Sequence, residues 1–312
     1  MNAEDRKRVL AGKAPVKKKP GKRDEAPPMT TGQSVMSWVK TIVTSLLIVM
    51  VVNGLLIASF VVPTGSMEDE VMTGDFVFVN KFVYGGSTPQ TIPFIDVPLP
   101  YFRFPGIRQP EKGDVIVFIF PGYRDQVKAD QFQYYLKRCV ATAGDTLQVR
   151  NATVFVNGKE QPMPRHAKFD QDHAAVQPGD NARIFPDGSG FSRDNWGPMR
   201  IPKKGDVIPL NDSTYYAYRI FMAREGHEIE RNGQIITIDG KAANTYTVER
   251  DYCFGMGDNR WNSLDSRYWG FVPVENVVGT PLFVYWSWNT DEPNFFKKFG
   301  TIRWSRIFSG VN

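Results

Sequence analysis

Two short segments carry side chains that could act together as a nucleophile and its base. Ser66 follows a proline and a glycine in Pro63-Thr-Gly-Ser-Met67, where a constrained turn can present its hydroxyl. Lys137 lies inside the apolar segment Tyr134-Tyr-Leu-Lys-Arg-Cys-Val140. Burial disfavours a charged lysine and lowers its pKa, and a neutral lysine can act as a general base. Simpler interpretations are a turn serine and a solvent-facing lysine on an edge strand. Because Lys137 and Arg138 are adjacent, we expect at least one of them to face solvent.

A third segment, residues 257–270, gathers polar side chains in one loop, Gly-Asp-Asn-Arg-Trp-Asn-Ser-Leu-Asp-Ser-Arg-Tyr-Trp-Gly. A solvated turn does not need so many functional groups, and loops held by a rigid scaffold often carry function. Asp265 and Arg267 are spaced to pair, and Ser263 could hydrogen bond beside a catalytic amine. We expect this loop to support the site, and we expect the segment Lys112–Phe118 to be structural.

Other kinds of site find little support in the sequence. Two cysteines, Cys139 and Cys253, allow at most one disulfide, and the three histidines lack the spacing of zinc ligands. No phosphate-binding glycine motif is present. We therefore expect neither a metal nor a cofactor. The first 40 residues hold ten Lys or Arg against four Asp or Glu, which is +6 of a chain total of +5 and leaves −1 for the remainder. A near-neutral body argues against nucleic-acid binding.

The elements that must position these groups begin with an apolar run over residues 41–62, TIVTSLLIVMVVNGLLIASFVV. A helix of roughly 20 apolar residues spans a bilayer, whereas a cleaved signal has a shorter apolar stretch of about 7–15 residues. The run predicts a single transmembrane helix, with a buried core helix as the alternative. The basic tail, residues 1–40, is expected to stay in the cytoplasm. About 250 residues then lie outside.

Beyond the span the pattern predicts a mainly β, antiparallel domain and no further long helix. Strands are expected in six segments: residues 75–80, 114–120, 146–150, 153–157, 235–239 and 283–288. The predicted organisation is a catalytic β core at 63–157 and 251–290, an inserted β subdomain at 158–250 and a C-terminal segment at 291–312. Residues 85–112, rich in proline and aromatic residues, are read either as an extended edge hairpin or as an apolar flap at the membrane surface.

Taken in their order along the chain, these segments resemble those of the bacterial type I signal peptidases, or leader peptidases. The resemblance extends from about Val61 to Gly279. The motifs are a Ser-Met pair after a span, a Lys-Arg pair in a strand, and GDNR-x-NS-x-DSR-YWG-FVP. The resemblance implies a Ser/Lys-dyad endopeptidase on an all-β fold. It implies Ser66 as nucleophile and Lys137 as base, working through an acyl-enzyme. It further implies that the Thr64 hydroxyl and the Ser66 N–H form the oxyanion hole, and that Ser263, Asp265 and Arg267 orient the dyad.

The same resemblance implies signal peptides of exported preproteins as substrates, with small residues at the first and third positions before the cut. Candidate pocket residues are Val62, Met67, Val71, Tyr135 and Leu136, and the substrate is expected to bind as an added strand. The implied location is the bacterial cytoplasmic (inner) membrane, single-pass, with the catalytic domain outside. The expected partners are the lipid bilayer and the export translocon, near which the protein is expected to act as a monomer.

The sequence departs from the family pattern just after the nucleophile. Glu68, Asp69 and Glu70 stand where the family usually has a proline and small or hydroxyl residues. If these acids lie near Lys137, they would raise its pKa. They support an alternative reading as a catalytically silent, membrane-tethered binding module. A third reading, a self-processing regulator, would need an effector domain, for which the 40-residue tail is too short and too polar.

Overall fold

The computed structural model describes residues 30–88, 102–170 and 184–311. The chain divides into two units, Met1–Leu47 and Ile48–Asn312. Helix α2 (Thr31–Val51) continues as a π-helical turn (Val52–Leu56), and the 26 residues of Thr31–Leu56 are long and apolar enough to cross a membrane. The helix therefore begins ten residues before the apolar run.

The helix also ends earlier than predicted, because residues 57–61 form a strand instead of its last turns. This strand, β1 (Ile57–Val61), pairs antiparallel with the strand at residues 75–80 from Ile57 opposite Asn80 to Val61 opposite Phe76. Tertiary pairing therefore outweighs the helical reading of this apolar stretch. β1 belongs to the same unit as Ser66 and leads directly into its turn.

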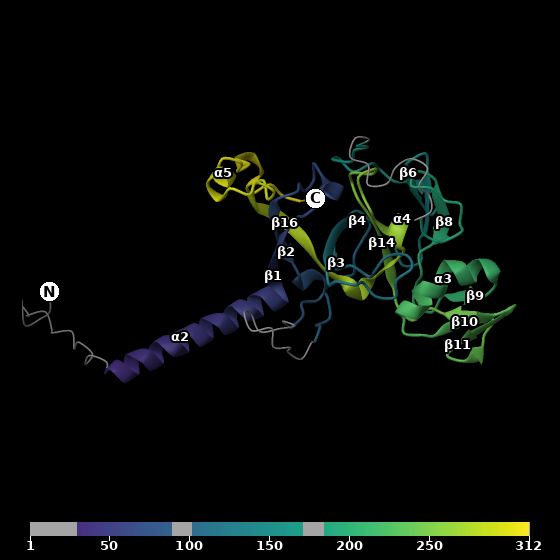
Figure 1. Cartoon of the computed structure of the whole chain (residues 1–312), viewed down its shortest axis with the longest axis horizontal. Coiled ribbons are helices and arrows are strands. Elements are labelled where there is room, and N and C mark those ends of the chain that lie inside the picture. Colours follow the sequence, from purple (N-terminus) through teal and green to yellow (C-terminus); the bar gives the residue numbers. More distant parts are fainter. Residues whose placement is uncertain (1–29, 89–101, 171–183, 312) are drawn as a thin grey trace, which may run out of the picture. The chain divides into compact units, whose positions relative to one another are not determined.

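The central sheet has seven strands in the order β1-β2-β16-β3-β4-β14-β15, and all neighbours are antiparallel (Figure 1). Its other strands are β2 (Asp75–Asn80), β3 (Val115–Ile119), β4 (Tyr134–Thr142), β14 (Tyr252–Met256), β15 (Val272–Pro273) and β16 (Val277–Ser287). The first and last parts of the domain thus interleave in one sheet, which brings β4 and the loop after β14 together.

Three smaller sheets hold most of the chain between β4 and β14. A four-stranded sheet, β7-β6-β5-β8, is made from β5 (Thr146–Arg150), β6 (Thr153–Val156), β7 (Lys159–Glu160) and β8 (Trp196–Arg200). β9 (Val207–Pro209) pairs with β13 (Thr245–Thr247), and β10 (Ile229–Asn232), β11 (Ile235–Ile238) and β12 (Lys241–Ala242) form the third sheet. β5 and β6, which the predicted organisation assigns to the catalytic core, pair in the four-stranded sheet with β7 and β8.

The expectation of no further long helix is wrong, because α3 (Asp212–Arg224) lies within the inserted part. Asn211 starts the helix: its side chain accepts hydrogen bonds from the backbone N–H groups of Ser213 and Thr214, and the Thr214 hydroxyl accepts one from the Asn211 backbone. This reciprocal arrangement is a capping box. Phe221 and Met222 are buried on the core side. Four aromatic residues obscured the helix, because aromatic side chains are common in strands.

The remaining helices are short. They are α4 (Ser266–Trp269), α5 (Phe295–Phe299) and the 3₁₀ turns Gly65–Met67, Phe82–Tyr84, Val274–Asn276 and Trp304–Arg306. Residues 89–101 lie outside the part of the chain that the structure describes. The choice between an edge hairpin and an apolar flap for residues 85–112 depends on that part and stays open. The flanks of this segment meet in an antiparallel bridge between Ser87 and Arg103.

Buried apolar side chains form three clusters around these sheets. One cluster lies beneath the Ser66 turn and joins Met67 and Val71 to valines of β2, β3 and β16. A second lies on the other side of β3 and β4 and includes Trp269. The third fills the inserted part and packs on β14 through Phe254 and Met256. The turn, the lysine strand and the polar loop are therefore each fixed to a packed core, which limits their movement relative to one another.

Candidate active site

Ser66 and Lys137 lie in direct contact. The Nζ of Lys137 donates to the Oγ of Ser66 at 2.5 Å. The serine is in the 3₁₀ turn after β1, and the lysine is on β4. Their exposed fractions are 7% and 4%. A hydroxyl and an amine at this distance, shielded from bulk water, form a nucleophile–base pair in reach of proton transfer.

The surroundings of Lys137 favour its neutral form. Burial lowers its pKa to about 8, and the neighbouring Arg267 cation acts in the same direction, whereas Asp265 and Asp258 oppose the shift. The Nζ also donates to the backbone carbonyl of Leu136 at 3.0 Å. A Cβ added to Gly255 would lie 3.1 Å from the Lys137 Cβ. The lysine stem is thus held closely between its own strand and β14.

Thr64 lies on the approach to the serine. Its Oγ1 is 3.4 Å from the Oγ of Ser66, and its backbone is extended. The Thr64 hydroxyl is exposed to the adjoining cleft. Thr64 therefore lines the cleft beside the Ser66 hydroxyl.

The polar loop supports the pair through a buried carboxylate. Ser263 donates to the Oδ2 of Asp265 at 2.8 Å, and Arg267 reaches both carboxylate oxygens at 2.8 and 2.7 Å. Asp265 also caps α4 and accepts from the Gly257 N–H at 3.1 Å. These three side chains are at most 1% exposed. Within the described residues no hydrogen bond joins Ser263 to Lys137; the charge of Asp265 acts on the pKa of the amine, and Ser263 contacts that carboxylate.

The expectation that Lys137 or Arg138 faces solvent is wrong. Arg138 is only 8% exposed. Its guanidinium binds the carboxylate of Asp258 through Nε at 2.9 Å and Nη2 at 2.6 Å. The two side chains do point to opposite faces of β4, but both faces are covered here. Sequence reasoning missed Asp258 as the partner, although its position in the polar loop was a usable signal.

The acids at positions 68–70 contact side chains other than Lys137. Glu68 and Asp69 lie 3.0 and 3.8 Å from the Nζ of Lys168. Glu70 is buried and contacts the Nδ1 of His166 at 2.6 Å. The charges that shift the pKa of Lys137 are those of Asp265, Arg267 and Asp258. The acids at positions 68–70 are not among them.

A cleft of about 850 Å³ opens beside the pair. Its walls come from Ser59–Thr64 on one side and from Gln133–Lys137 on the other. Four of the predicted pocket residues line it, namely Val62, Met67, Tyr135 and Leu136. Val71 does not: its exposed fraction is 0%, and it belongs to the core beneath the turn. The segment after Ser66 is too short for the spacing of its apolar residues to predict which side chains line the cleft and which are buried in the core.

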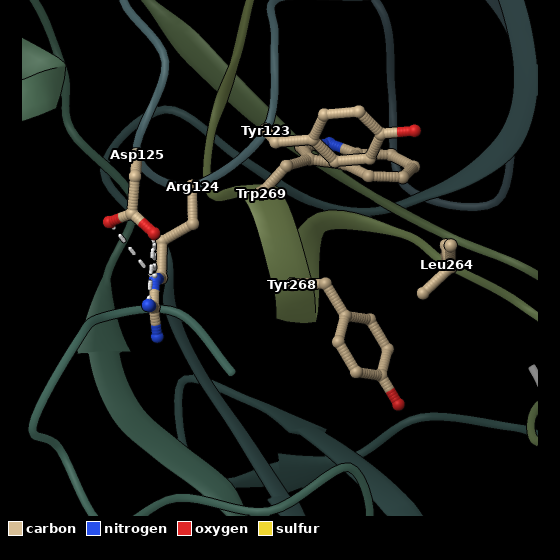
Figure 2. Close-up of a pocket in the computed structure, with 6 residues that line it drawn as sticks. All are labelled: Tyr123, Arg124, Asp125, Leu264, Tyr268 and Trp269. Atoms are coloured by element: carbon tan, nitrogen blue, oxygen red, sulfur yellow. Dashed lines mark hydrogen bonds and ion pairs between the residues drawn. The ribbon is translucent and has the colours of Figure 1, made fainter. Parts of the chain in front are cut away.

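A second pocket of about 320 Å³ adjoins the cleft at Leu264, which lines both. Figure 2 shows the Arg124 guanidinium facing the carboxylate of its neighbour Asp125. The arginine and the aspartate pair at 3.0 Å. The charges in this pocket are thus directed at each other, and the group suited to covalent chemistry is in the larger cleft.

Cys139 and Cys253 are both buried and free. Within the described residues no group of three or more His, Cys, Asp or Glu side chains could hold a metal ion.

A family model and the similar proteins all indicate the same family. Residues 35–286 match the family model described as signal peptidase, peptidase S26. The chain is similar to a signal peptidase I of Helicobacter pylori, with 31% identity over 88% of this chain and 91% of that protein. Signal peptidases I of Rickettsia typhi and Pseudomonas aeruginosa are each 28% identical, over 85% and 80% of this chain and 89% and 73% of those proteins.

The match runs from the apolar helix through the Ser66 turn, β4 and the polar loop to the last strand of the sheet. The matched residues include both Ser66 and Lys137. The chain therefore belongs to the peptidase S26 family and is a serine endopeptidase of the signal peptidase type.

Proposed function

We propose that Ser66 is the nucleophile and Lys137 the general base that cut signal peptides from exported preproteins. The observation that carries this proposal is the 2.5 Å contact between Nζ and Oγ in a buried setting. Neutral Lys137 takes the Ser66 proton while Oγ bonds to the scissile carbonyl carbon. The C–N bond then breaks, and the lysine returns the proton to the departing amine.

Water completes the reaction on the resulting ester. Lys137 is neutral again after the first half, so it can take a proton from water as the water attacks the acyl carbon. The Ser66 oxygen leaves and recovers a proton from the lysine. In both halves negative charge develops on the carbonyl oxygen, where the Thr64 hydroxyl and the Ser66 N–H are the proposed donors. The Asp265–Arg267 pair with Ser263 keeps the lysine side of the site fixed.

An extended substrate fits between the two walls of the cleft. Among the described residues, the pairing of β14 with β4 ends at Met256 opposite Arg138, one residue before Lys137. β1 is an edge strand of the sheet, next to β2. A peptide placed between these two backbones can hydrogen bond as an added strand. Val62, Met67, Tyr135 and Leu136 would then contact its side chains, which suits the small residues expected before the cut.

We place the protein in the bacterial cytoplasmic membrane, with the basic N-terminal tail inside and the catalytic unit outside. The apolar helix and the excess of lysine and arginine before it support this orientation. In this position the site meets signal peptides as they leave the export translocon, and we propose that one copy of the chain is sufficient. The alternative of a silent binding module rested on the acids at 68–70, and their pairing with Lys168 and His166 removes that argument.

The test is cleavage of a preprotein by the purified full-length protein in detergent. Mass spectrometry of the product should show one new N-terminus, at the end of the signal peptide. The Ser66→Ala protein, purified in the same way, should give none. An intact preprotein with the unaltered enzyme, or equal cleavage by Ser66→Ala, would overturn the proposal.

A further inference from the structure

The acidic triplet after the nucleophile, Glu68–Glu70, is matched by a basic segment of the inserted part. Lys168 lies between the first two acids, with its Nζ 3.0 Å from Glu68 and 3.8 Å from Asp69. His166 contacts Glu70 at 2.6 Å. These contacts join segments about 100 residues apart in sequence, so it is the tertiary structure that brings the acids and their partners together.

The backbone of Lys168 is anchored to the polar loop. Its N–H donates to the carbonyl of Asp258 at 3.0 Å, and its carbonyl accepts from the N–H of Arg260 at 2.8 Å. These two bonds make a parallel bridge between Lys168 and Asn259. The lysine is therefore held where its side chain reaches back across the loop to the Ser66 turn.

The Glu68 carboxylate lies very close to the backbone that precedes the nucleophile. A Cβ added to Gly65 would be 3.3 Å from the Glu68 Oε2. Gly65 lies between Thr64 and Ser66, the two proposed oxyanion donors. A carboxylate without a counter-charge at this place would oppose the negative charge that builds up on the substrate oxygen, because charges in a partly buried site are weakly screened.

The same turn has a conformation that needs support. Asp69 has φ of +77°, in the left-handed region that residues other than glycine seldom adopt. The Asn259 amide bonds the Gly65 carbonyl at 3.2 Å, and the Asn259 N–H bonds the Ser66 carbonyl at 3.1 Å. The turn is thus fixed to the loop through Asn259, and Lys168 adds ion pairs to both Glu68 and Asp69.

We propose that Lys168 is a positioning residue for the reaction, and that its role is to neutralise Glu68 and Asp69 beside the oxyanion site. It touches neither the substrate nor the reacting atoms in this account. This inference rests on the proposed function. It assigns a use to the inserted part, which supplies the counter-charge that the acids of this chain require.

The test is a double-mutant cycle in the full-length protein with a preprotein substrate. Lys168→Met should lower kcat roughly three- to thirtyfold with little change in KM, because the lost interaction matters mainly in the transition state. Lys168→Arg should retain most of the activity. Adding Glu68→Gln and Asp69→Asn to Lys168→Met should restore kcat, since the charge to be neutralised is then gone.

A matched control is Lys159→Met, which removes an exposed lysine of β7 in the same inserted part and should leave kcat unchanged. Thermal unfolding of each variant separates misfolding from the electrostatic effect. Normal kcat in Lys168→Met, or failure of the two acid substitutions to restore it, would overturn the inference. Absence of cleavage by the unaltered protein would instead overturn the proposed function.

Discussion

At the scale of single residues, the pKa of Lys137 makes a prediction about pH. The base must be neutral, and burial lowers its pKa to about 8. Below that value the lysine is mostly protonated and cannot accept the Ser66 proton. We therefore expect kcat/KM to rise with pH and to level off above about 8. Rates measured from pH 6 to 10 would test this.

The acids beside the nucleophile provide the control for the pH profile. Because Glu68 and Asp69 pair with Lys168 and do not shift the lysine pKa, Glu68→Gln with Asp69→Asn should leave the midpoint of the rise where it is. A profile without a rise between neutral and alkaline pH would contradict a lysine base.

Gly257 provides a second prediction at this scale. A Cβ at this position would lie 2.2 Å from the Ser263 Oγ and 2.6 Å from the Ser66 carbonyl oxygen. Gly257→Ala must therefore move either the loop or the nucleophile turn. A displacement of about 1 Å can cost on the order of a hundredfold in rate, so we expect kcat/KM to fall by about that factor.

Gly310→Ala is the matched control for this substitution, because its nearest atom is the Leu282 carbonyl oxygen at 3.9 Å. It should cleave at the normal rate. Equal activity of the two alanine variants would mean that the loop and the turn are not held against each other.

At the scale of elements, the pairing of β4 with the polar loop depends on a buried ion pair. Removing one partner of such a pair leaves an uncompensated charge and costs about 3–5 kcal/mol. Arg138→Met should therefore strongly lower the thermal unfolding temperature, and a second change, Asp258→Leu, should recover part of the loss. Calorimetry of both variants would measure this.

The control pair at this scale is Arg200 and Asp206, 2.9 Å apart and partly exposed. Exposed pairs contribute about 0–1 kcal/mol, so Arg200→Met should change stability little. Similar losses from Arg138→Met and Arg200→Met would show that the pair on β4 is not an important contact.

The elements also show how far the sequence could be read. Strands with a clear two-residue alternation, such as β2 and β5, were predicted at their observed bounds. β1 was not, because an apolar run that continues a helix has no local signal for the point at which pairing with β2 begins. Helix α3 was missed because its aromatic residues favour strands individually, while its capping box at Asn211 and its packing through Phe221 decide the outcome.

In the candidate site, too, some residues could be predicted from local sequence and others depend on tertiary contacts. Ser66 and Lys137 could be identified because their residue types carry the chemistry and their segments match a family pattern. The partners Lys168 and His166 could not, since they come from the inserted part and meet the turn only through the tertiary fold. Arg138 was misjudged because alternation along a strand says which face a side chain points to, and not whether that face is covered.

At the scale of the whole molecule, the orientation in the membrane should depend on the basic tail. Lysines and arginines within about 15–20 residues of a span keep that side in the cytoplasm. A reporter at the C-terminus should therefore be exported, and one placed before Trp38 should stay inside. Replacing Lys17, Lys18, Lys19, Lys22 and Arg23 with glutamine should reduce export of the C-terminal reporter.

Protease protection in spheroplasts would measure this orientation directly. The C-terminal unit of the unaltered chain should be digested from outside while the tail is protected. The reverse pattern would place the cleft on the wrong side of the membrane for cutting exported preproteins.

We propose that Ser66 and Lys137 act as one unit, which their double-mutant cycle would measure. kcat/KM for a preprotein would be determined for Ser66→Ala, Lys137→Met and the combined variant. Because each residue is useless without the other, each single change should lower the rate as far as both together. Near-normal cleavage by Lys137→Met, or losses that multiply in the combined variant, would contradict the account.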